Sequence, residues 1–384
     1  MSLNATRRQP LDGLRAAAAI GVAFYHGILH FDTTLIERVL YQPILSVESG
    51  ELGTKLLLIV FNGESSIVVF FVLSGFVLQG ALTRMSSRTT AATAAIFTFQ
   101  RIVRIYPAVV VCLALLLALS LAAQQVGFSR FPAFSWAQAV ENAALYAPTI
   151  HGPSWSVQVE VCCIPFLLAA EFLRRRYGLL GLFCMLVYAL IAIEYPVLVF
   201  RLPALWPYLF MFILGMLAAS PATATMVRGL HPAAVWVAIP LFLAARHATS
   251  RAAISGLIAQ GLAAALLVGC IAYRDDAVTR TLSARAMVFL GRISYSFYLL
   301  NVIALYMMWA MIETCVDEPG RHAVLWGLLS ATASVALTLP AAAVSERLVE
   351  RPCIWLGRMI LRDRPISQAR RLQGTAAEAD TGAV

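Results

Sequence analysis

An arginine and a histidine share one apolar segment near the start of the chain, at a spacing that would let them act together. Arg15 and His26 are eleven residues apart in the run from Leu11 to His30. Each residue of an α-helix turns the chain by about 100°, so both side chains fall on one face, roughly 16 Å apart along the axis. A neutral imidazole accepts and returns a proton near neutral pH, because its pKa is about 6.5. His26 is therefore a candidate general base.

Both residues also have simpler interpretations. His26 could be a buried histidine that only hydrogen-bonds a neighbouring helix, and Arg15 could anchor the helix end at the cytoplasmic surface. Asp12, in the sequence DGLR, could pair with Arg15 and make this unit a structural latch. Ionisable groups inside a bilayer cost about 2.5–3.5 kcal/mol each, so they are functional candidates by default. Together with the shared face, this cost favours the catalytic interpretation.

A carboxylate and a hydroxyl lie one helical turn apart in the sequence PSWSVQVEVCC. Ser156 and Glu160 are four residues apart and so are neighbours on one helix face. Glu160 could orient an imidazole or bind a hydroxyl of a substrate. It could equally form an interhelical salt bridge that only fixes packing, and the two interpretations have even weight.

Two arginines lie one turn apart in QRIVRIYP, which we expect to be a loop at the inner membrane surface. Guanidinium groups such as those of Arg101 and Arg104 suit the recognition of phosphate. On spacing alone, lipid-headgroup binding or an orientation signal is slightly favoured. Ser74, in the apolar sequence FFVLSGFVL, has no activating neighbour in the sequence, so we do not expect it to be a nucleophile.

Composition predicts the elements that must position these residues. Of 384 residues, 60% are hydrophobic and 13% charged, and the mean hydropathy is +0.78, far from a soluble domain with about 25% charged residues. A spanning helix needs about 20 apolar residues. We predict an all-α polytopic bundle of about ten transmembrane helices, forming one membrane domain over residues 1–362. We expect the polar tail, 363–384, to be a disordered cytoplasmic segment.

The charges predict orientation. The chain has 29 Lys+Arg against 20 Asp+Glu, and in a membrane protein this excess indicates the cytoplasmic side rather than a nucleic-acid partner. Alternate connections are rich in arginine, which predicts cytoplasmic N- and C-termini. The seven cysteines have no C-x-x-C spacing, so neither a disulfide framework nor a metal site is expected.

The predicted helices follow the apolar runs. They cover about 11–30, 56–82, 108–124, 153–173, 179–193, 202–220, 233–245, 254–273, 288–312 and 323–344. The segment SWAQAVENAALYAP, between the third and fourth, is expected to be a re-entrant or interfacial helix.

Five segments, taken in order, carry a resemblance that covers nearly the whole chain. They are LDGLRAAAAIGVAFYH, FFVLSGFVL, QRIVRIYP, SWSVQVE and LGRISYSFYLL, followed by VERP, between Leu11 and Pro352. In this order and spacing they resemble the acyltransferase-3 family of membrane O-acyltransferases. One position departs from the pattern: many members have histidine where this chain has Asn301, so a second imidazole is not expected.

The resemblance implies an enzyme that uses cytoplasmic acyl-CoA as a co-substrate, without a permanently bound cofactor. The acyl group, acetyl in the simplest case, would pass to a hydroxyl of a cell-surface carbohydrate or glycolipid, in the bacterial inner membrane. The implied catalytic residues are His26, Arg15 and Glu160. Arg101 and Arg104, with Arg15, would bind acyl-CoA. We expect Asp12, Trp155 and Ser156 to bind substrate.

Two rivals come from other classes of protein. A transporter or flippase of a lipid-linked or small polar substrate would also line an internal cavity with histidine, carboxylate and arginine side chains. A structural or sensory membrane protein would use the buried charges only to set packing. Transport predicts substrate movement without consumption of acyl-CoA, and the structural role predicts that variants at His26 lose stability rather than turnover. The sequence predicts no oligomeric state.

Overall fold

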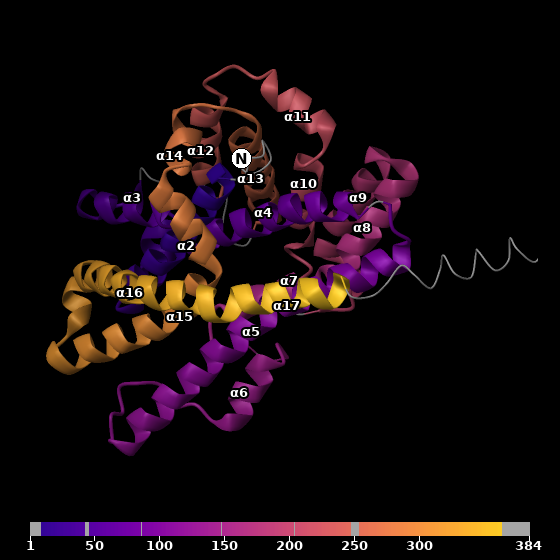
Figure 1. The fold of residues 1–384 in the computed structure, drawn as a ribbon. Coiled ribbons are helices and arrows are strands. Elements are labelled where there is room, and N and C mark those ends of the chain that lie inside the picture. Colours follow the sequence, from indigo (N-terminus) through magenta and orange to yellow (C-terminus); the bar gives the residue numbers. More distant parts are fainter. Residues whose placement is uncertain are drawn as a thin grey trace, which may run out of the picture.

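The computed structural model describes residues 9–42, 46–85, 87–146, 148–202, 204–246 and 253–362. Every regular element in these ranges is helical, which confirms the predicted all-α class (Figure 1). The predicted tail, 363–384, lies outside the described residues.

The α-helices of the described chain are α2 (Gln9–His30), α3 (Leu52–Val60), α4 (Gly63–Arg84), α5 (Thr90–Gln125), α6 (Trp136–Ala143), α7 (Ser154–Cys162), α8 (Ile164–Tyr177), α9 (Leu179–Glu194), α10 (Leu209–Ala218), α11 (Pro221–Arg228), α12 (Ala234–Ala245), α13 (Ile254–Tyr273), α14 (Ala277–Leu282), α15 (Arg285–Cys315), α16 (Ala323–Ser345) and α17 (Arg351–Arg362). Short 3₁₀ or π-helical turns are η1 (Ile36–Leu40), η3 (Ser49–Glu51), η4 (Pro196–Val199), η5 (Pro319–His322) and η6 (Glu346–Glu350).

Several helices are long enough to span a membrane. By length and composition, six segments of the described chain qualify: Ser49–Arg84, Thr90–Gln125, Ser154–Tyr177, Ile254–Tyr273, Arg285–Cys315 and Pro319–Leu361. The pair α10 and α11, bent by 70°, makes a seventh candidate, and α9 and α12 are shorter apolar helices. The predicted ten crossings require α2, α9, α12 and the bent pair to cross as well. The chain is a multi-pass membrane protein, and the count of ten stays a prediction.

Two predicted helices have different boundaries in the structure. The second is not continuous, because Asn62 caps a new helix by accepting a hydrogen bond from the Ser65 backbone N–H at 2.8 Å, which separates α3 from α4. The third begins at Thr90, capped by Thr89, rather than near Ala108. The sequence QRIVRIYP is therefore helical and not a loop, and Pro107 lies inside the helix.

Helix α2 lies inside the bundle, with α4, α15 and α16 packed around it. Residues without bulky side chains permit these close approaches. A Cβ atom on Gly13 would lie 2.0 Å from the carbonyl oxygen of Leu282, and one on Gly27 would lie 2.7 Å from the Cβ of Ala331 in α16. Asp12 meets Gly291, and His30 meets Glu313, so α2 and α15 run in the same direction.

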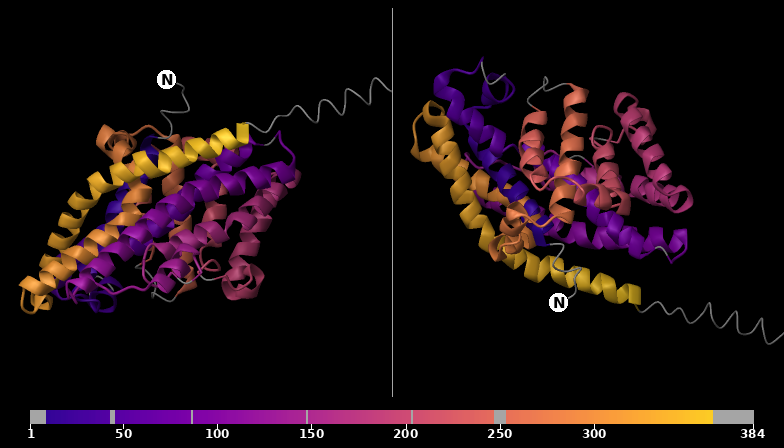
Figure 2. Two further views of the ribbon diagram at one scale, coloured as in Figure 1. Left: turned by 60° about the horizontal axis from the view of Figure 1, so that its bottom comes forward. Right: turned by 90° about the horizontal axis from the view of Figure 1, so that it is seen from above.

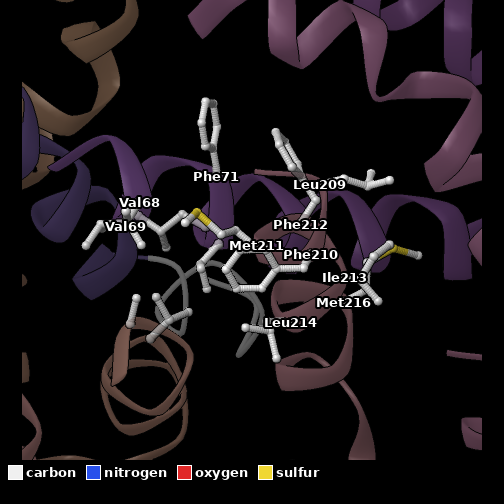
Figure 3. Close-up of a cluster of buried hydrophobic side chains, with 14 of the residues drawn as sticks. Val68, Val69, Phe71, Leu209, Phe210, Met211, Phe212, Ile213, Leu214 and Met216 are labelled. Atoms are coloured by element: carbon white, nitrogen blue, oxygen red, sulfur yellow. The ribbon is translucent and has the colours of Figure 1, made fainter. Parts of the chain in front are cut away.

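Helices α4 and α10 cross at the largest apolar cluster of the described chain. A Cβ on Gly75 would lie 2.0 Å from the carbonyl oxygen of Phe212, so these two backbones nearly touch. The rings of Phe71 and Phe212 stack with centroids 4.9 Å apart. Figure 3 shows both rings beside the buried residues of α10. This contact holds the helix that carries Ser74 against the rest of the bundle.

The last helices form one long unit. Helix α16 continues through η6 into α17, and α17 packs along α5. In Figure 2 (left) the yellow α17 lies beside the violet α5 over much of its length. The C-terminal helix therefore covers the segment that carries Arg101 and Arg104.

Candidate active site

A buried stripe along α5 aims one arginine into the bundle. Thr93, Phe97, Arg101 and Ile105 are spaced by four residues and all are buried. This spacing keeps their side chains on one face. Arg101 is only 7% exposed, so its charge needs a partner inside the protein.

That partner is Glu160 of α7. An Arg101 Nη2 donates to a carboxylate oxygen of Glu160 at 2.7 Å, and the Ser74 hydroxyl of α4 donates to the other oxygen at 2.9 Å. The carboxylate thus joins three helices. The Arg101 Nε is buried and has no hydrogen-bond partner among the described residues.

The Arg101–Glu160 pair faces a cavity of about 90 Å³. Helices α2, α4, α5, α7 and α15 contribute to its wall, which is formed by Arg15, Ile67, Phe70, Phe71, Ser74, Val77, Leu78, Arg101, Arg104, Ile105, Ser156, Val157, Glu160, Ser294, Tyr295 and Tyr298. We call this space the inner cavity. It brings together five of the eight residues that the sequence singled out.

The inner cavity has more positive than negative groups in its wall. It holds three guanidinium groups and one carboxylate. Arg15 is 3.2 Å from Asp12, the predicted ion pair, and Arg101 is paired with Glu160. Arg104 is exposed and forms no hydrogen bond or ion pair with any residue that the structure describes. The cavity therefore offers a cation to an anionic ligand.

Two neighbouring residues of α7 have different surroundings. The Ser156 hydroxyl lies in the cavity wall, 2.9 Å from the Tyr298 hydroxyl of α15. Trp155 does not line the inner cavity. Its ring packs against Phe71 and Tyr208, with centroids 6.2 and 5.5 Å apart, because one residue along a helix turns the side chain by about 100°. Trp155 therefore belongs to the apolar packing rather than to the wall of the inner cavity.

His26 lies on the same helix as Arg15 but not in the wall of the inner cavity. On α2, Tyr25 packs against α4 at Gly63, whereas His30 contacts α15. At 100° per residue, the directions of His26 and Arg15 both fall between these two contacts. Both side chains therefore face the seam between α4 and α15, at different depths. The His26 side chain is exposed there, while Tyr25 is buried.

The end of α2 carries a polar cluster that sequence reasoning missed. The imidazole of His30 lies flat on the indole of Trp309, with centroids 3.8 Å apart and an interplanar angle of 1°. Its Nε2 is 3.0 Å from a Glu313 oxygen, and Arg130 is 4.0 Å from the other oxygen. A pocket of about 430 Å³ opens at this point. The sequence signal was the four-residue spacing of His26 and His30, which puts both on one helix face.

Asn301, the departure from the family pattern, faces away from the inner cavity. Its side-chain amide donates to the hydroxyls of Ser334 and Thr338 on α16, at 3.3 and 3.4 Å. Within the described ranges, no cluster of three or more His, Cys, Asp and Glu side chains is arranged to hold a metal ion.

The family of the chain follows from a match over most of its length. The family model for the acyltransferase-3 acyltransferase domain matches residues 9–344, which include every residue of the inner cavity. No curated protein and no solved structure matches this chain. The match agrees with the resemblance carried by the ordered motifs and with a helical membrane bundle that has a polar cavity. The chain belongs to the acyltransferase-3 family, and it is a multi-pass membrane acyltransferase.

Proposed function

We propose that this protein moves an acyl group, acetyl in the simplest case, from cytoplasmic acyl-CoA to a hydroxyl of a cell-surface carbohydrate or glycolipid. The observation that carries the proposal is the convergence of three guanidinium groups on one cavity with a single carboxylate. Acyl-CoA carries several phosphate charges at one end and a thioester at the other. Arginine forks are well suited to those phosphates. The cavity chemistry thus fits the donor better than it fits a neutral solute.

In this proposal His26 is the general base. Its imidazole takes the proton of the acceptor hydroxyl while the hydroxyl oxygen attacks the thioester carbonyl carbon. The new C–O bond forms, the C–S bond breaks, and the departing thiolate of CoA takes the proton from the imidazolium. A positioned base of this kind accelerates a reaction by about 10² to 10⁴. Arg15 lies roughly 16 Å from His26 along the axis of α2. An extended pantetheine arm would bridge that distance.

Glu160 has a positioning role in this scheme. Both of its oxygens already accept hydrogen bonds, from Arg101 and Ser74. These contacts favour one role for the Glu160 carboxylate, which is to hold Arg101 toward the donor. They do not favour a role in orienting His26 or the acceptor. Ser156, hydrogen-bonded to Tyr298 in the cavity wall, is well sited to contact a bound substrate.

The acceptor would approach from the opposite end of α2, in the bacterial inner membrane. The pocket beside His30, Arg130 and Glu313 presents charged and hydrogen-bonding groups suited to a hydroxylated ligand. This pocket lies at the C-terminal end of α2, close to His26 in the sequence. The three arginines of the inner cavity lie toward the N-terminal end of α2. Donor and acceptor would therefore meet near His26 from opposite sides.

The test is transfer of labelled acetyl from acetyl-CoA in membranes that contain the wild-type protein or His26→Ala, at matched expression. We expect the variant to lose at least about a hundredfold in turnover, with an unchanged unfolding midpoint. His231→Ala, at an exposed position outside both pockets, is the control and should keep wild-type turnover. Wild-type activity in His26→Ala would remove the proposed base. Movement of a glycolipid without release of CoA would instead indicate a flippase.

A further inference from the structure

A second cavity lies directly beside the inner cavity. It has a volume of about 250 Å³ and shares Val77, Leu78, Arg101 and Arg104 with the inner cavity. The rest of its wall is formed by Ala81, Arg84, Phe97, Gln100, Val103, Ile354, Gly357 and Arg358. We call this second space the outer groove. A ligand that filled both spaces would pass Arg101 and Arg104.

The wall of the outer groove is strongly basic. Four of its described wall residues are arginines, and none is acidic. Arg84 comes from the end of α4, Arg101 and Arg104 come from α5, and Arg358 comes from α17. Apolar side chains, Phe97 and Ile354 among them, complete the wall. Such a site combines a strong preference for anions with room for a flat apolar group.

Helix α17 forms one side of the outer groove, with Ile354, Gly357 and Arg358. Gly357 is buried against α5, where a Cβ atom would lie 3.0 Å from Val103. This close contact brings the next residue, Arg358, into the wall of the groove beside α5. The family-matched segment ends at residue 344, before α17 begins at Arg351. The α17 wall thus lies outside the matched segment.

We propose that the outer groove binds the nucleotide phosphates of the acyl donor, with Arg358 and Arg84 contacting them at its mouth. Arg104, at the junction, contacts the phosphate that leads into the pantetheine arm. The pantetheine arm then passes through the inner cavity and carries the thioester toward His26. This proposal rests on acyl-CoA being the donor. It makes α17 the element that distinguishes a full coenzyme A donor from a donor without the nucleotide.

The experiment compares two donors with the purified protein in nanodiscs of phosphatidylcholine. One donor is acetyl-CoA, and the other is S-acetylpantetheine, which lacks the nucleotide and its phosphates. For Arg358→Ala we expect KM for acetyl-CoA to rise about tenfold, the loss of one charge-assisted contact, with kcat little changed. KM for S-acetylpantetheine should stay within twofold of wild type. Arg358→Lys should recover part of the loss, because it keeps the charge without the planar fork.

The matched control is Arg347→Ala, which removes an exposed arginine of η6 that does not line the groove. It should leave both KM values unchanged. The proposal is overturned if Arg358→Ala has no effect, or if it affects both donors equally. An effect that appears only in nanodiscs with an anionic lipid, and for both donors, would also overturn it and would identify a lipid headgroup as the ligand.

A binding measurement separates this proposal from the proposed function. Calorimetric binding of CoA itself, without an acceptor, needs no turnover. If wild type fails to transfer acetyl but binds CoA, and Arg358→Ala weakens that binding, the groove stands while the proposed reaction fails. If the wild-type protein does not bind CoA at all, both proposals fail.

Discussion

Removing one partner of the ion pair between Arg101 and Glu160 should destabilise the protein strongly, because the other charge would stay largely buried without its partner. Their side chains are 8% and 22% exposed, so neither group recovers full hydration. At the 2.7 Å separation, two unit charges attract by about 6 kcal/mol with an effective dielectric of about 20. Desolvation offsets much of this attraction. For Arg101→Met we expect a loss of about 3 kcal/mol in the free energy of unfolding, because Glu160 is left charged and unpaired.

The double variant Arg101→Met/Glu160→Gln should be more stable than Arg101→Met alone, by about 2 kcal/mol, since no uncompensated charge remains. Equilibrium unfolding in mixed detergent micelles would measure this. The buried thiols of Cys112 and Cys163 become reactive to a thiol dye as the bundle opens. Arg321→Ala is the control, because its i,i+3 pair with Glu318 is 77% and 68% exposed and should contribute nothing measurable.

Two outcomes would refute this reasoning about the pair. The first is a wild-type unfolding curve for Arg101→Met, which would mean that the carboxylate is hydrated or has another cation. The second is a double variant whose loss equals the sum of the two single losses. Additive losses would mean that the two side chains do not interact energetically, in spite of their distance.

Two further predictions concern packing and use the same unfolding assay. Gly75→Ala should destabilise the bundle by about 1–3 kcal/mol, because its Cβ would overlap the Phe212 carbonyl oxygen, whereas Gly53→Ala, with open space around it, should not. Lys55→Met should cost about 1–3 kcal/mol, because the buried Lys55 ammonium donates to three backbone carbonyls, those of residues 39, 40 and 42, at 3.0, 2.6 and 2.6 Å. If Gly75→Ala or Lys55→Met unfolds like the wild-type protein, the corresponding contact does not contribute to stability as we infer.

Helix positions were largely predictable, and the errors have local causes. The eighth predicted helix, 254–273, coincides with α13, because hydropathy and length define an apolar crossing. The sequence does not predict the start of α5, because threonines and the arginines at 101 and 104 interrupt its apolar run and Pro107 suggests a helix start. Proline inside a helix usually breaks it, but here Thr89 caps the helix and a buried stripe continues through the proline.

The candidate site was predictable as a set of residues but not as an arrangement. Helical spacing correctly put Ser156 and Glu160 on one face, and both line the inner cavity. Spacing could not say that Trp155, the adjacent residue, packs into the apolar core. The catalytic roles of His26 and Glu160 stay predictions.

Arg358 shows the clearest limit of sequence reasoning. In the chain it is 254 positions from Arg104, within an arginine-rich C-terminal segment that indicates only orientation. In the fold the two arginines line one groove. Only the packing of Gly357 against α5 brings them together, and no local pattern predicts that contact.

The sequence by itself determined the membrane class, the helical periodicity, the family and the short list of charged residues, because hydropathy and helix spacing are properties of neighbouring residues. The tertiary structure decided which of these residues meet. It joined Arg101 to Glu160 across 59 positions, turned His30 onto Trp309, and brought α17 to the mouth of the groove. The physical reason is that helix contacts depend on close approach at glycines and on the shapes of facing surfaces. These arise between segments that are far apart in the chain.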